Sequence, residues 1–297
     1  MTDFQKEFEL YLTDTKGASK NTLESYARDI SQFINYLLKN NIEDVTDVSV
    51  NTVKDYISFC EKSGKSHATI TRIVASIRCY YNFLIEKNLV KINPTKTIKV
   101  SRAEKKMPEI LTNSEIDKLL SQPNLNDSKG IRDKAMLELL YATGIRVSEL
   151  INLNSDDVYF DVGVIHCSGT KNDRIIPVYS TAIEILKKYV ENVRPLCVIN
   201  DEENALFVNM NGQRLTRQGF WKIIKMYAKE AKINKDITPH TLRHSFAAHL
   251  LKNGAKLKDI QEMLGHSDIS STQIYAQLMK NQYSTVYNKY HPRANRG

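Results

Sequence analysis

The chain has 297 residues, of which 41% are hydrophobic and 26% charged, as in ordinary globular proteins, and this length is enough for two domains. No apolar run approaches the ~20 residues that span a bilayer, and the acidic amino terminus lacks the apolar stretch of a signal peptide, so we expect a cytoplasmic protein without a membrane partner. The net charge of +8 suits a polyanionic partner such as nucleic acid without proving one.

The first 92 residues are expected to be nearly all helix, because apolar residues recur there at intervals of three and four. The pattern is strong over residues 19–38, shorter over 50–57 and strong again over 70–85. Asn93 precedes Pro94, and a residue before proline is steered out of helical geometry. We therefore end the first domain at residue 94.

Residues 95–108 differ in composition from the helices before them. Lys99, Arg102, Lys105 and Lys106 fall in this stretch among only scattered apolar residues. Such a composition is typical of an extended basic linker between two domains. We favour a linker that contacts DNA over a solvated loop with incidental charge.

The second domain, residues 109–297, is expected to open with a helix. Thr112 and Glu115 have the spacing of a capping box, in which the hydroxyl caps the helix and the carboxylate reaches back to the cap. Helical periodicity then continues to Leu150.

After Leu150 the period of the hydrophobic pattern changes. Two short β-branched runs, 163–167 and 174–179, flank a turn and predict a β-hairpin. Residues 205–209 are a candidate third strand, and from Thr216 the pattern is helical almost to the end. The expected fold is mainly α, with a small antiparallel β-sheet in the C-terminal domain.

Several residues of the second domain are suited to cleaving a phosphodiester. The transition state places negative charge on the non-bridging phosphate oxygens, which the planar guanidinium groups of Arg146 and Arg243 could bind. Tyr275 could attack phosphorus as a covalent catalyst. A free phenol, with a pKa of ~10, is only ~0.1% ionised near neutral pH, so a base or a strongly cationic pocket must help.

The remaining proton transfers have candidates in the same domain. His240 could take the proton of the phenol, and Lys171 at the hairpin turn could protonate the leaving 5′ oxygen. His266 could donate a further hydrogen bond to the phosphate. This division of roles predicts acid–base catalysis by side chains alone.

Each of these residues also has a plainer interpretation. Arg146 could simply pair with Glu149, and Lys171 could be a solvated turn residue. His240 could cap a helix, and Tyr275, one of fifteen tyrosines, could be a core residue. Only the combination of these residues, in this order and with these neighbours, favours catalysis.

A metal site fits the sequence poorly. His244 and His249 lie five apart, outside a His-Glu-x-x-His frame, and no Cys-x-x-C occurs among the four cysteines. A nucleotide-binding Gly-x-x-x-x-Gly-Lys-Ser/Thr loop is also missing from the sequence. We expect reduced thiols, no metal and no cofactor.

Three segments resemble the motifs of the tyrosine recombinases and, within them, of the bacterial Xer recombinases. ATGIRVSEL at 142–150 is similar to the first arginine box, and HTLRHSFA at 240–247 is similar to the His-x-x-Arg box. LGHS at 264–267 and TQIY at 272–275 are similar to the nucleophile box. The resemblance covers essentially the whole chain, and the three boxes together are highly specific.

This resemblance implies a catalytic set and an architecture. The implied catalytic residues are Arg146, Lys171, His240, Arg243, His266 and the nucleophile Tyr275, with Glu149 as an accessory acid. The implied fold is a C-shaped clamp, in which a SAM-like core-binding domain, residues 1–94, and a catalytic domain, residues 109–297, close around DNA. The turn at 169–172 is one residue shorter than in many Xer proteins, so Lys171 is assigned as the only lysine of the hairpin.

The resemblance also implies double-stranded DNA as substrate and partner. Candidate contacts are Lys20, Lys65, Ser66, Thr69, Arg72, Arg102, Arg217, Gln218 and Lys222. Four subunits, identical or shared with a Xer paralogue, would assemble on two dif-like sites, and a septal DNA translocase could take part. The implied reaction passes through a 3′-phosphotyrosyl bond, and the implied role is resolution of chromosome dimers at cell division.

Three other functions stay open from the sequence. A recombinase of an integrating element or transposon uses the same chemistry, often with an additional arm-binding domain. A type IB topoisomerase uses similar residues but relaxes supercoils without pairing two sites. A catalytically silent DNA-binding regulator would lack at least one of the six catalytic positions, all of which are filled in this sequence.

Overall fold

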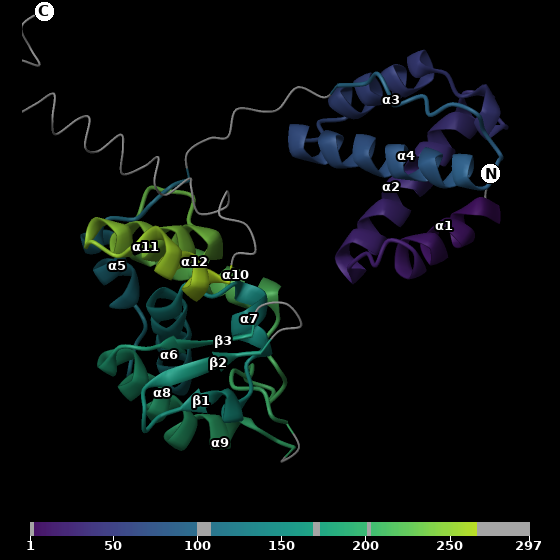
Figure 1. Cartoon of the computed structure of the whole chain (residues 1–297). Coiled ribbons are helices and arrows are strands. Elements are labelled where there is room, and N and C mark those ends of the chain that lie inside the picture. Colours follow the sequence, from purple (N-terminus) through teal and green to yellow (C-terminus); the bar gives the residue numbers. More distant parts are fainter. Residues whose placement is uncertain (1–2, 100–107, 169–172, 201–202, 266–297) are drawn as a thin grey trace, which may run out of the picture. The chain divides into compact units, whose positions relative to one another are not determined.

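The computed structural model describes residues 3–99, 108–168, 173–200 and 203–265 (Figure 1). The chain divides into two compact units, Met1–Lys105 and Lys106–Gly297, and each has its own hydrophobic core. Within the described residues, no helix is both long and apolar enough to cross a membrane.

In residues 3–99 of the N-terminal unit, four α-helices surround one core. They are α1 (Asp3–Asp14), α2 (Lys20–Lys39), α3 (Val50–Lys62) and α4 (His67–Glu86), with a 3-10 turn, η1 (Val45–Asp47), before α3. The predicted apolar stripes face this core, where Phe33 and Ile77 are fully buried. Ser19, Ser49 and Ser66 precede α2, α3 and α4, and each side chain accepts a hydrogen bond from a backbone N–H of the first turn.

The chain that follows α4 is tied back onto that helix. Nη2 of Arg78 donates to the carbonyls of Thr95 and Ile98 at 3.2 and 2.9 Å, and the side chain of Asn93 accepts from the Thr95 amide at 2.9 Å. Thr95 is fully buried. The first part of the predicted extended linker is therefore folded against α4, and only its later part lies outside the described residues.

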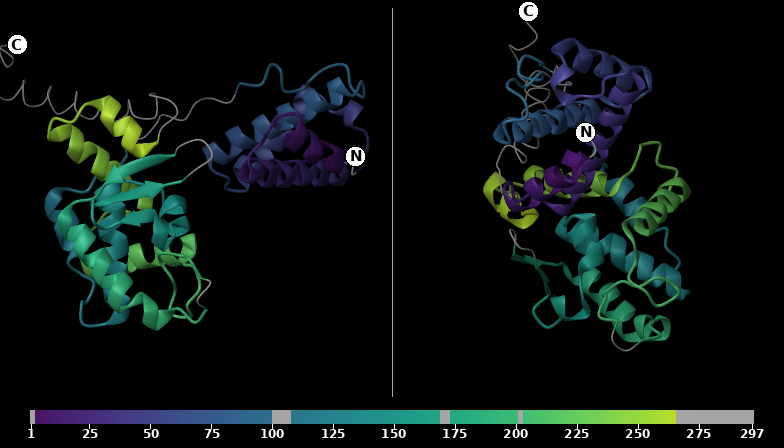
Figure 2. Two further views of the ribbon diagram at one scale, coloured as in Figure 1. Left: turned by 60° about the horizontal axis from the view of Figure 1, so that its bottom comes forward. Right: turned by 90° about the vertical axis from the view of Figure 1, so that its right-hand side faces the viewer.

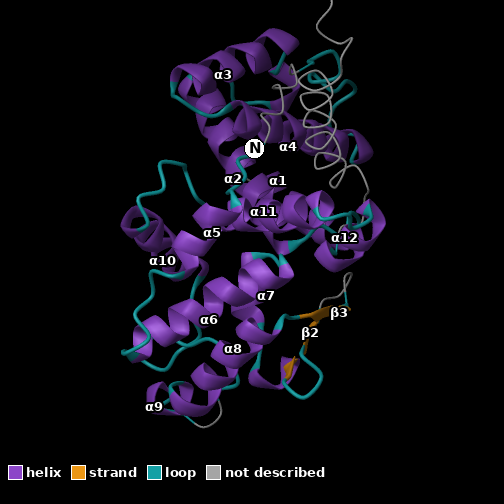
Figure 3. Ribbon diagram, turned by 90° about the vertical axis from the view of Figure 1, so that its left-hand side faces the viewer, coloured by secondary structure: helices purple, strands orange, loops and turns teal. Residues whose placement is uncertain are grey.

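In the described part of the C-terminal unit, helices dominate (Figure 3). They are α5 (Asn113–Leu120), α6 (Ser128–Thr143), α7 (Val147–Asn152), α8 (Ser180–Asn192), α9 (Arg194–Cys197), α10 (Arg217–Glu230), α11 (Pro239–Lys252) and α12 (Leu257–Leu264), with a 3-10 turn, η2 (Ser155–Asp157). Helix α6 is central: it packs against α5, α7, α8 and α11, and Met136, Leu139 and Leu140 on it are fully buried. The predicted capping box of α5 is confirmed, because the Thr112 amide donates to Glu115 at 2.7 Å and the Glu115 amide donates to Thr112 at 3.2 Å.

A small antiparallel sheet lies along one side of this unit (Figure 2). Its strands are β1 (Val158–Tyr159), β2 (Val164–Cys167) and β3 (Arg174–Pro177), in the order β1-β2-β3. Cys167 pairs with Arg174 at the end of the β2–β3 ladder, next to the turn. The predicted hairpin and the mainly α fold with a small antiparallel sheet are confirmed.

The prediction of a third strand at residues 205–209 is wrong. These residues form only isolated bridges, between Asn154 and Ala205 and between Val208 and Arg214, whereas the third strand of the sheet is β1. The segment is apolar because its side chains are buried: Phe207 and Val208 have no exposed surface. Burial alone gives an apolar run, and such a run cannot be distinguished from a strand by its pattern.

Helix α11 is held to the beginning of the described C-terminal unit. Ser245 on α11 accepts a hydrogen bond from the amide of Leu111 at 2.9 Å. Nε2 of His249, one turn further along, lies 2.9 Å from the carbonyl of Leu111, and its Nδ1 lies 2.9 Å from the hydroxyl of Tyr141. A carbonyl can only accept, so Nε2 of His249 carries a proton and donates it to Leu111.

Candidate active site

The first arginine of the site follows a sharp turn between two helices. Gly144 ends α6 in the left-handed conformation, with φ of +59°, and Arg146 stands at the N-cap of α7. A Cβ atom on Gly144 would lie 2.3 Å from the ring of Phe246, so no other residue fits at this position without displacing that ring. The turn therefore places Arg146 two residues after Gly144, which caps the buried C-terminal end of α6, and at the start of α7.

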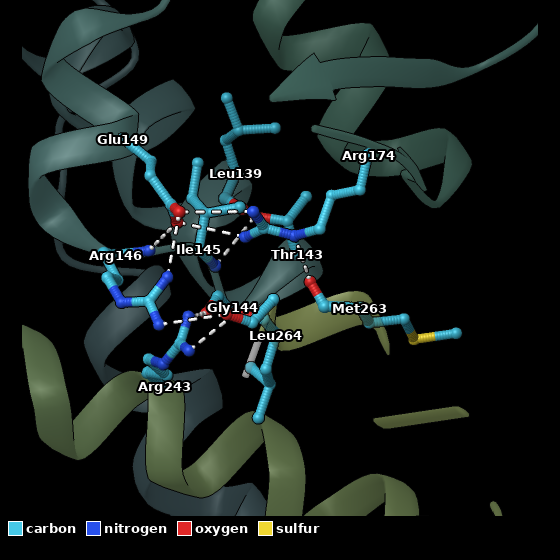
Figure 4. A network of polar contacts seen from close by, with 11 residues as sticks. Leu139, Thr143, Gly144, Ile145, Arg146, Glu149, Arg174, Arg243, Met263 and Leu264 are labelled. Carbon is cyan, nitrogen blue, oxygen red and sulfur yellow. Dashed lines mark hydrogen bonds and ion pairs between the residues drawn. The ribbon is translucent and has the colours of Figure 1, made fainter. Parts of the chain in front are cut away.

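The second arginine, Arg243, comes from the first half of α11. Only 4% of its surface is exposed, and its guanidinium donates hydrogen bonds to the carbonyl of Gly144 and, at 2.8 Å, to that of Leu264. Nη2 of Arg146 donates to the next carbonyl, that of Gly265, at 3.2 Å. The two guanidinium groups therefore meet at the C-terminal end of α12, as Figure 4 shows.

Glu149 lies between Arg146 and a third arginine, Arg174 of β3 (Figure 4). One carboxylate oxygen accepts from Nη1 of Arg146 at 3.0 Å and from Nη1 of Arg174 at 3.2 Å. The other accepts from the Arg146 amide at 2.7 Å and from Nη2 of Arg174 at 3.0 Å. The cluster thus contains three guanidiniums, of which two bind Glu149 and the third, that of Arg243, donates to the carbonyls of Gly144 and Leu264. One carboxylate offsets only part of their charge, and the remaining positive charge suits an anionic phosphate.

The environment of Glu149 favours its ionised form. Burial raises the pKa of this carboxyl, but hydrogen bonds from Arg174 and from the Arg146 amide outweigh burial, so its pKa lies below the usual value. Ionised Glu149 therefore stabilises the fold in full above the pKa of an unfolded glutamate, ~4.3, and this contribution is lost as the pH falls through the lower folded-state pKa.

We expect Glu149→Gln to lower the free energy of unfolding at neutral pH, because the amide cannot replace a carboxylate that accepts four hydrogen bonds. The difference from the wild type should shrink as the pH falls from ~4.3, where the carboxyl of the unfolded wild-type chain gains a proton, through the lower folded-state pKa. Urea unfolding between pH 7 and pH 3 measures this difference. A gap of constant size over that range would contradict the argument.

The two histidines of the His-x-x-Arg box have different environments. His240 is exposed in the first turn of α11, whose N-cap is Thr238 rather than the histidine. Burial, with the nearby charges of His240 and Arg243, lowers the pKa of His244 to about 4. His244 is therefore neutral at physiological pH, whereas the imidazole of His240 is accessible to a substrate.

The structure brings together part of the predicted catalytic set. Arg146, Glu149 and Arg243 share one cluster, and His240 stands on the same helix as Arg243. Lys171, His266 and Tyr275 lie outside the described residues. In the described part of the chain, no group of three or more His, Cys, Asp or Glu side chains could hold a metal ion.

The sequence patterns did not predict a role for Arg174. Its side chain is 10% exposed, it binds Glu149 with two nitrogens, and its Nε donates to the carbonyl of Met263 at 2.7 Å. A signal was available: Arg174 is a basic residue that directly follows the predicted turn, at a position that the hairpin pattern places opposite buried Cys167. A periodic pattern of that kind predicts which face a residue occupies, not its partner.

The predicted DNA-binding residues at and before the start of α4 have structural partners in the N-terminal unit. Ser66 caps α4 by accepting from the Thr69 amide at 3.3 Å, and the two hydroxyls lie 2.8 Å apart. Lys65 donates to Gln32 at 2.9 Å. These contacts leave the start of α4 polar and at the surface. Arg102 lies outside the described residues.

Arg72 and Lys20 complete the candidates of this unit. Arg72 pairs with Asp29 at 3.1 Å, and Asp29 is only 2% exposed. Burial raises the pKa of Asp29, and the charge of Arg72 opposes that shift. Loss of Arg72 would therefore leave a buried carboxylate without this partner and would destabilise the fold, apart from any effect on DNA. Lys20, the first residue of α2, is exposed.

In the C-terminal unit the candidates lie on one exposed part of α10. Arg217, Gln218 and Lys222 are exposed, and Thr216 caps the helix in front of them. The helix packs against α7, whose N-cap is Arg146. Trp221 is 47% exposed between these residues, and Nζ of Lys225 lies 5.2 Å from its ring centroid.

Comparisons with known proteins identify the family. Residues 109–282 match the phage integrase family, and residues 6–88 match the phage integrase N-terminal SAM-like domain. The chain is 45% identical over 292 residues to the tyrosine recombinase XerD of Oceanobacillus iheyensis, which covers 97% of this chain and 98% of that protein. It is 42% identical over 297 residues to the XerD of Listeria innocua, with 99% and 100% covered.

Solved structures show the same fold. A XerH site-specific recombinase bound to a palindromic difH substrate matches with a TM-score of 0.79 and 22% identity, over 96% of this chain and 84% of that one. The integrase of the Tn1549 transposon, in complex with circular intermediate DNA, matches with a TM-score of 0.74 and 21% identity, over 91% and 94%. This chain belongs to the phage integrase family and is a tyrosine recombinase of the Xer type.

Proposed function

We propose that this recombinase cuts and rejoins duplex DNA through a 3′-phosphotyrosyl bond to Tyr275. The observation that carries the proposal is the meeting of Arg146 and Arg243 at consecutive carbonyls, those of Gly265 and Leu264, in a cluster with net positive charge. Two planar guanidiniums side by side match the non-bridging oxygens of one phosphate, on which negative charge accumulates during transesterification.

The proposed steps balance without a further reactant. The phenol oxygen of Tyr275 bonds to phosphorus, the bond to the 5′ oxygen breaks, and the proton of the phenol passes to His240. Lys171 gives a proton to the leaving 5′ oxygen, and His266 donates a hydrogen bond to the phosphate. The 5′-hydroxyl of the partner duplex then attacks phosphorus and gives its proton to Lys171, while the bond to Tyr275 breaks and His240 returns a proton to the phenol oxygen. One diester bond replaces another at each step, so the energy of the diester is conserved.

We further propose how the protein holds its substrate. The core-binding domain, residues 1–94, and the catalytic domain, residues 109–297, would close around a duplex as a C-shaped clamp, joined by the linker that contains Arg102. Lys20, Lys65, Ser66, Thr69 and Arg72 would contact DNA from the first domain, and Arg217, Gln218 and Lys222 would contact it from the second. The DNA substrate in the XerH structure supports this proposal.

The biological role that we propose is resolution of chromosome dimers at a dif-like site during cell division. Its support is the identity of more than 40% to relatives named XerD over nearly the full chain. Two sites would be joined by four subunits, either four copies of this chain or pairs shared with a Xer paralogue, and a septal DNA translocase could take part.

A plasmid assay tests the proposed function. A supercoiled plasmid with two directly repeated dif-like sites should yield two smaller circles if the protein recombines DNA. Relaxed plasmid without smaller circles would indicate a type IB topoisomerase instead. Unchanged plasmid, with binding to the sites retained and with the paralogue supplied, would indicate a regulator and would contradict the proposal.

The tryptophan on α10 provides a test of the proposed DNA contact. Trp221 is the single tryptophan of the chain and is half exposed, so its fluorescence reports on this surface alone. We expect duplex DNA to change its emission and to protect it from iodide quenching. Arg217→Ala should weaken binding and reduce the salt dependence of log K by about one unit. Unchanged quenching at saturating DNA would place the duplex elsewhere.

A further inference from the structure

Arg174 joins three parts of the C-terminal unit that are far apart in sequence. It is the first residue of β3, directly after the hairpin turn, and it pairs across the ladder with Cys167 of β2. Its guanidinium reaches Glu149 on α7 and the carbonyl of Met263 on α12. The contacts therefore connect the strand residue next to the hairpin turn, the helix α7 that Arg146 caps and the end of α12.

The contact with Glu149 has the geometry of a fork. Nη1 and Nη2 of Arg174 approach the two carboxylate oxygens at 3.2 and 3.0 Å, and the same two oxygens accept from the Arg146 guanidinium and amide. A bidentate pair fixes the plane of the carboxylate as well as its position. The orientation of the Arg146 guanidinium consequently depends on Arg174 through Glu149.

The contact with α12 is equally close. Nε of Arg174 donates to Met263 at 2.7 Å, two residues before Gly265. Gly265 has φ of +61°, and a Cβ atom there would lie 2.8 Å from Nη1 of Arg174. The guanidinium thus lies directly against the backbone whose carbonyl, at Gly265, receives Arg146. Figure 4 shows Arg174 and Arg146 on opposite sides of Glu149.

We propose that Arg174 is a positioning residue for catalysis, which aligns Arg146 through Glu149 and fixes the root of the hairpin that carries Lys171 against α12. It acts through other residues, because the three nitrogens Nε, Nη1 and Nη2 point at protein acceptors and its side chain is only 10% exposed. This inference deepens the proposed function and rests on it.

The role requires an arginine rather than a positive charge. A lysine at this position keeps the charge but is a point donor that cannot form the fork and the third hydrogen bond together. We expect Arg174→Lys to slow cleavage of a nicked suicide duplex at saturating protein by ~10- to 100-fold, as for loss of residues that orient catalytic groups. The dissociation constant for the same duplex should change by less than ~3-fold, since Arg174 makes no DNA contact in this proposal.

Arg214→Lys is a matched control. Nη1 of Arg214 donates to the carbonyls of Ile151 and Leu153 at 2.8 and 3.1 Å, and Nη2 donates to Asn154 at 2.6 Å. These contacts hold the other end of α7 and do not involve Glu149. The control should lower thermal stability while its cleavage rate, measured well below the melting temperature, stays near that of the wild type.

A double-mutant cycle tests the path through Glu149. If Arg174 acts through that carboxylate, Glu149→Gln combined with Arg174→Lys should slow cleavage hardly more than the more severe single variant. Independent losses that multiply would overturn this path. Glu149→Gln removes the carboxylate that accepts from Arg174. This variant therefore tests the positioning role of Arg174 even if Arg174→Lys does not fold.

The results can distinguish failure of the positioning role of Arg174 from failure of the proposed recombinase function. Cleavage by Arg174→Lys at the wild-type rate, or an equal slowing by Arg214→Lys, would overturn the positioning role while the recombinase function stands. If wild-type protein with its paralogue formed no covalent adduct with the suicide duplex, the proposed chemistry would fail, and the positioning role would fall with it.

Discussion

Tyr275→Phe should abolish covalent attachment to DNA. A suicide duplex with a nick beside the scissile phosphate loses its short 5′-hydroxyl fragment after cleavage, so wild-type protein accumulates as a denaturation-resistant adduct. Phenylalanine has no oxygen with which to attack phosphorus, and we expect a loss on the order of 10⁶-fold, as for removal of other covalent nucleophiles. Denaturing gel electrophoresis with end-labelled DNA measures the adduct.

A second tyrosine of the same stretch of sequence is the control. Tyr283→Phe removes an identical hydroxyl eight positions later in the sequence. We expect this variant to form the covalent adduct as the wild type does. Both variants should still bind the unnicked duplex. An adduct formed by Tyr275→Phe at a rate near that of the wild type would show that another residue is the nucleophile.

Loss of Arg146 or Arg243 should produce the next largest effect. We expect Arg146→Ala to slow single-turnover cleavage by ~10²- to 10³-fold, the usual consequence of removing one donor to a developing negative charge. Its effect on DNA affinity should be small, because the guanidinium is expected to bind the transition state more strongly than the ground state. Rapid-quench cleavage and gel-shift titration measure the two quantities.

Arg243→Ala should differ from Arg146→Ala in its effect on the fold. Arg243 is 4% exposed and donates to the carbonyls of Gly144 and Leu264, whereas the side chain of Arg146 is 35% exposed. Each buried carbonyl left without a donor costs about 1–3 kcal/mol. Arg243→Ala should therefore lower the melting temperature as well as the rate. Equal melting temperatures for the two variants would contradict this assignment of contacts.

Local features of the chain were predictable because they depend on residues close in sequence. The capping box of Thr112 and Glu115 and the β2–β3 hairpin follow from spacing and from side-chain preferences within a few positions. The motif around Arg146 and that around Arg243 could be recognised for the same reason. Their meeting could not be derived from periodicity, since it depends on how α7, α11 and α12 pack.

Other features escaped prediction because they arise from tertiary contacts. Arg174 is an ordinary basic residue of a strand until packing brings Glu149 and Met263 to it. Arg72 was selected as a DNA contact, yet its nearest anion is the buried Asp29, from a different helix. The apolar run at 205–209 resembled a strand because burial and sheet formation select the same residue types.

Arg146 and Arg243 are both held by backbone oxygens. Arg146 and Arg243 donate to the carbonyls of Gly144, Leu264 and Gly265, and substitution of a side chain does not remove a carbonyl. Side chains of α12 can therefore be substituted during evolution by others of similar volume, because the carbonyl groups that accept these hydrogen bonds stay the same. Inherited changes that redirect the main chain at Gly144 or Gly265 are not tolerated in this way, because both have positive φ and a close neighbour where a Cβ would stand.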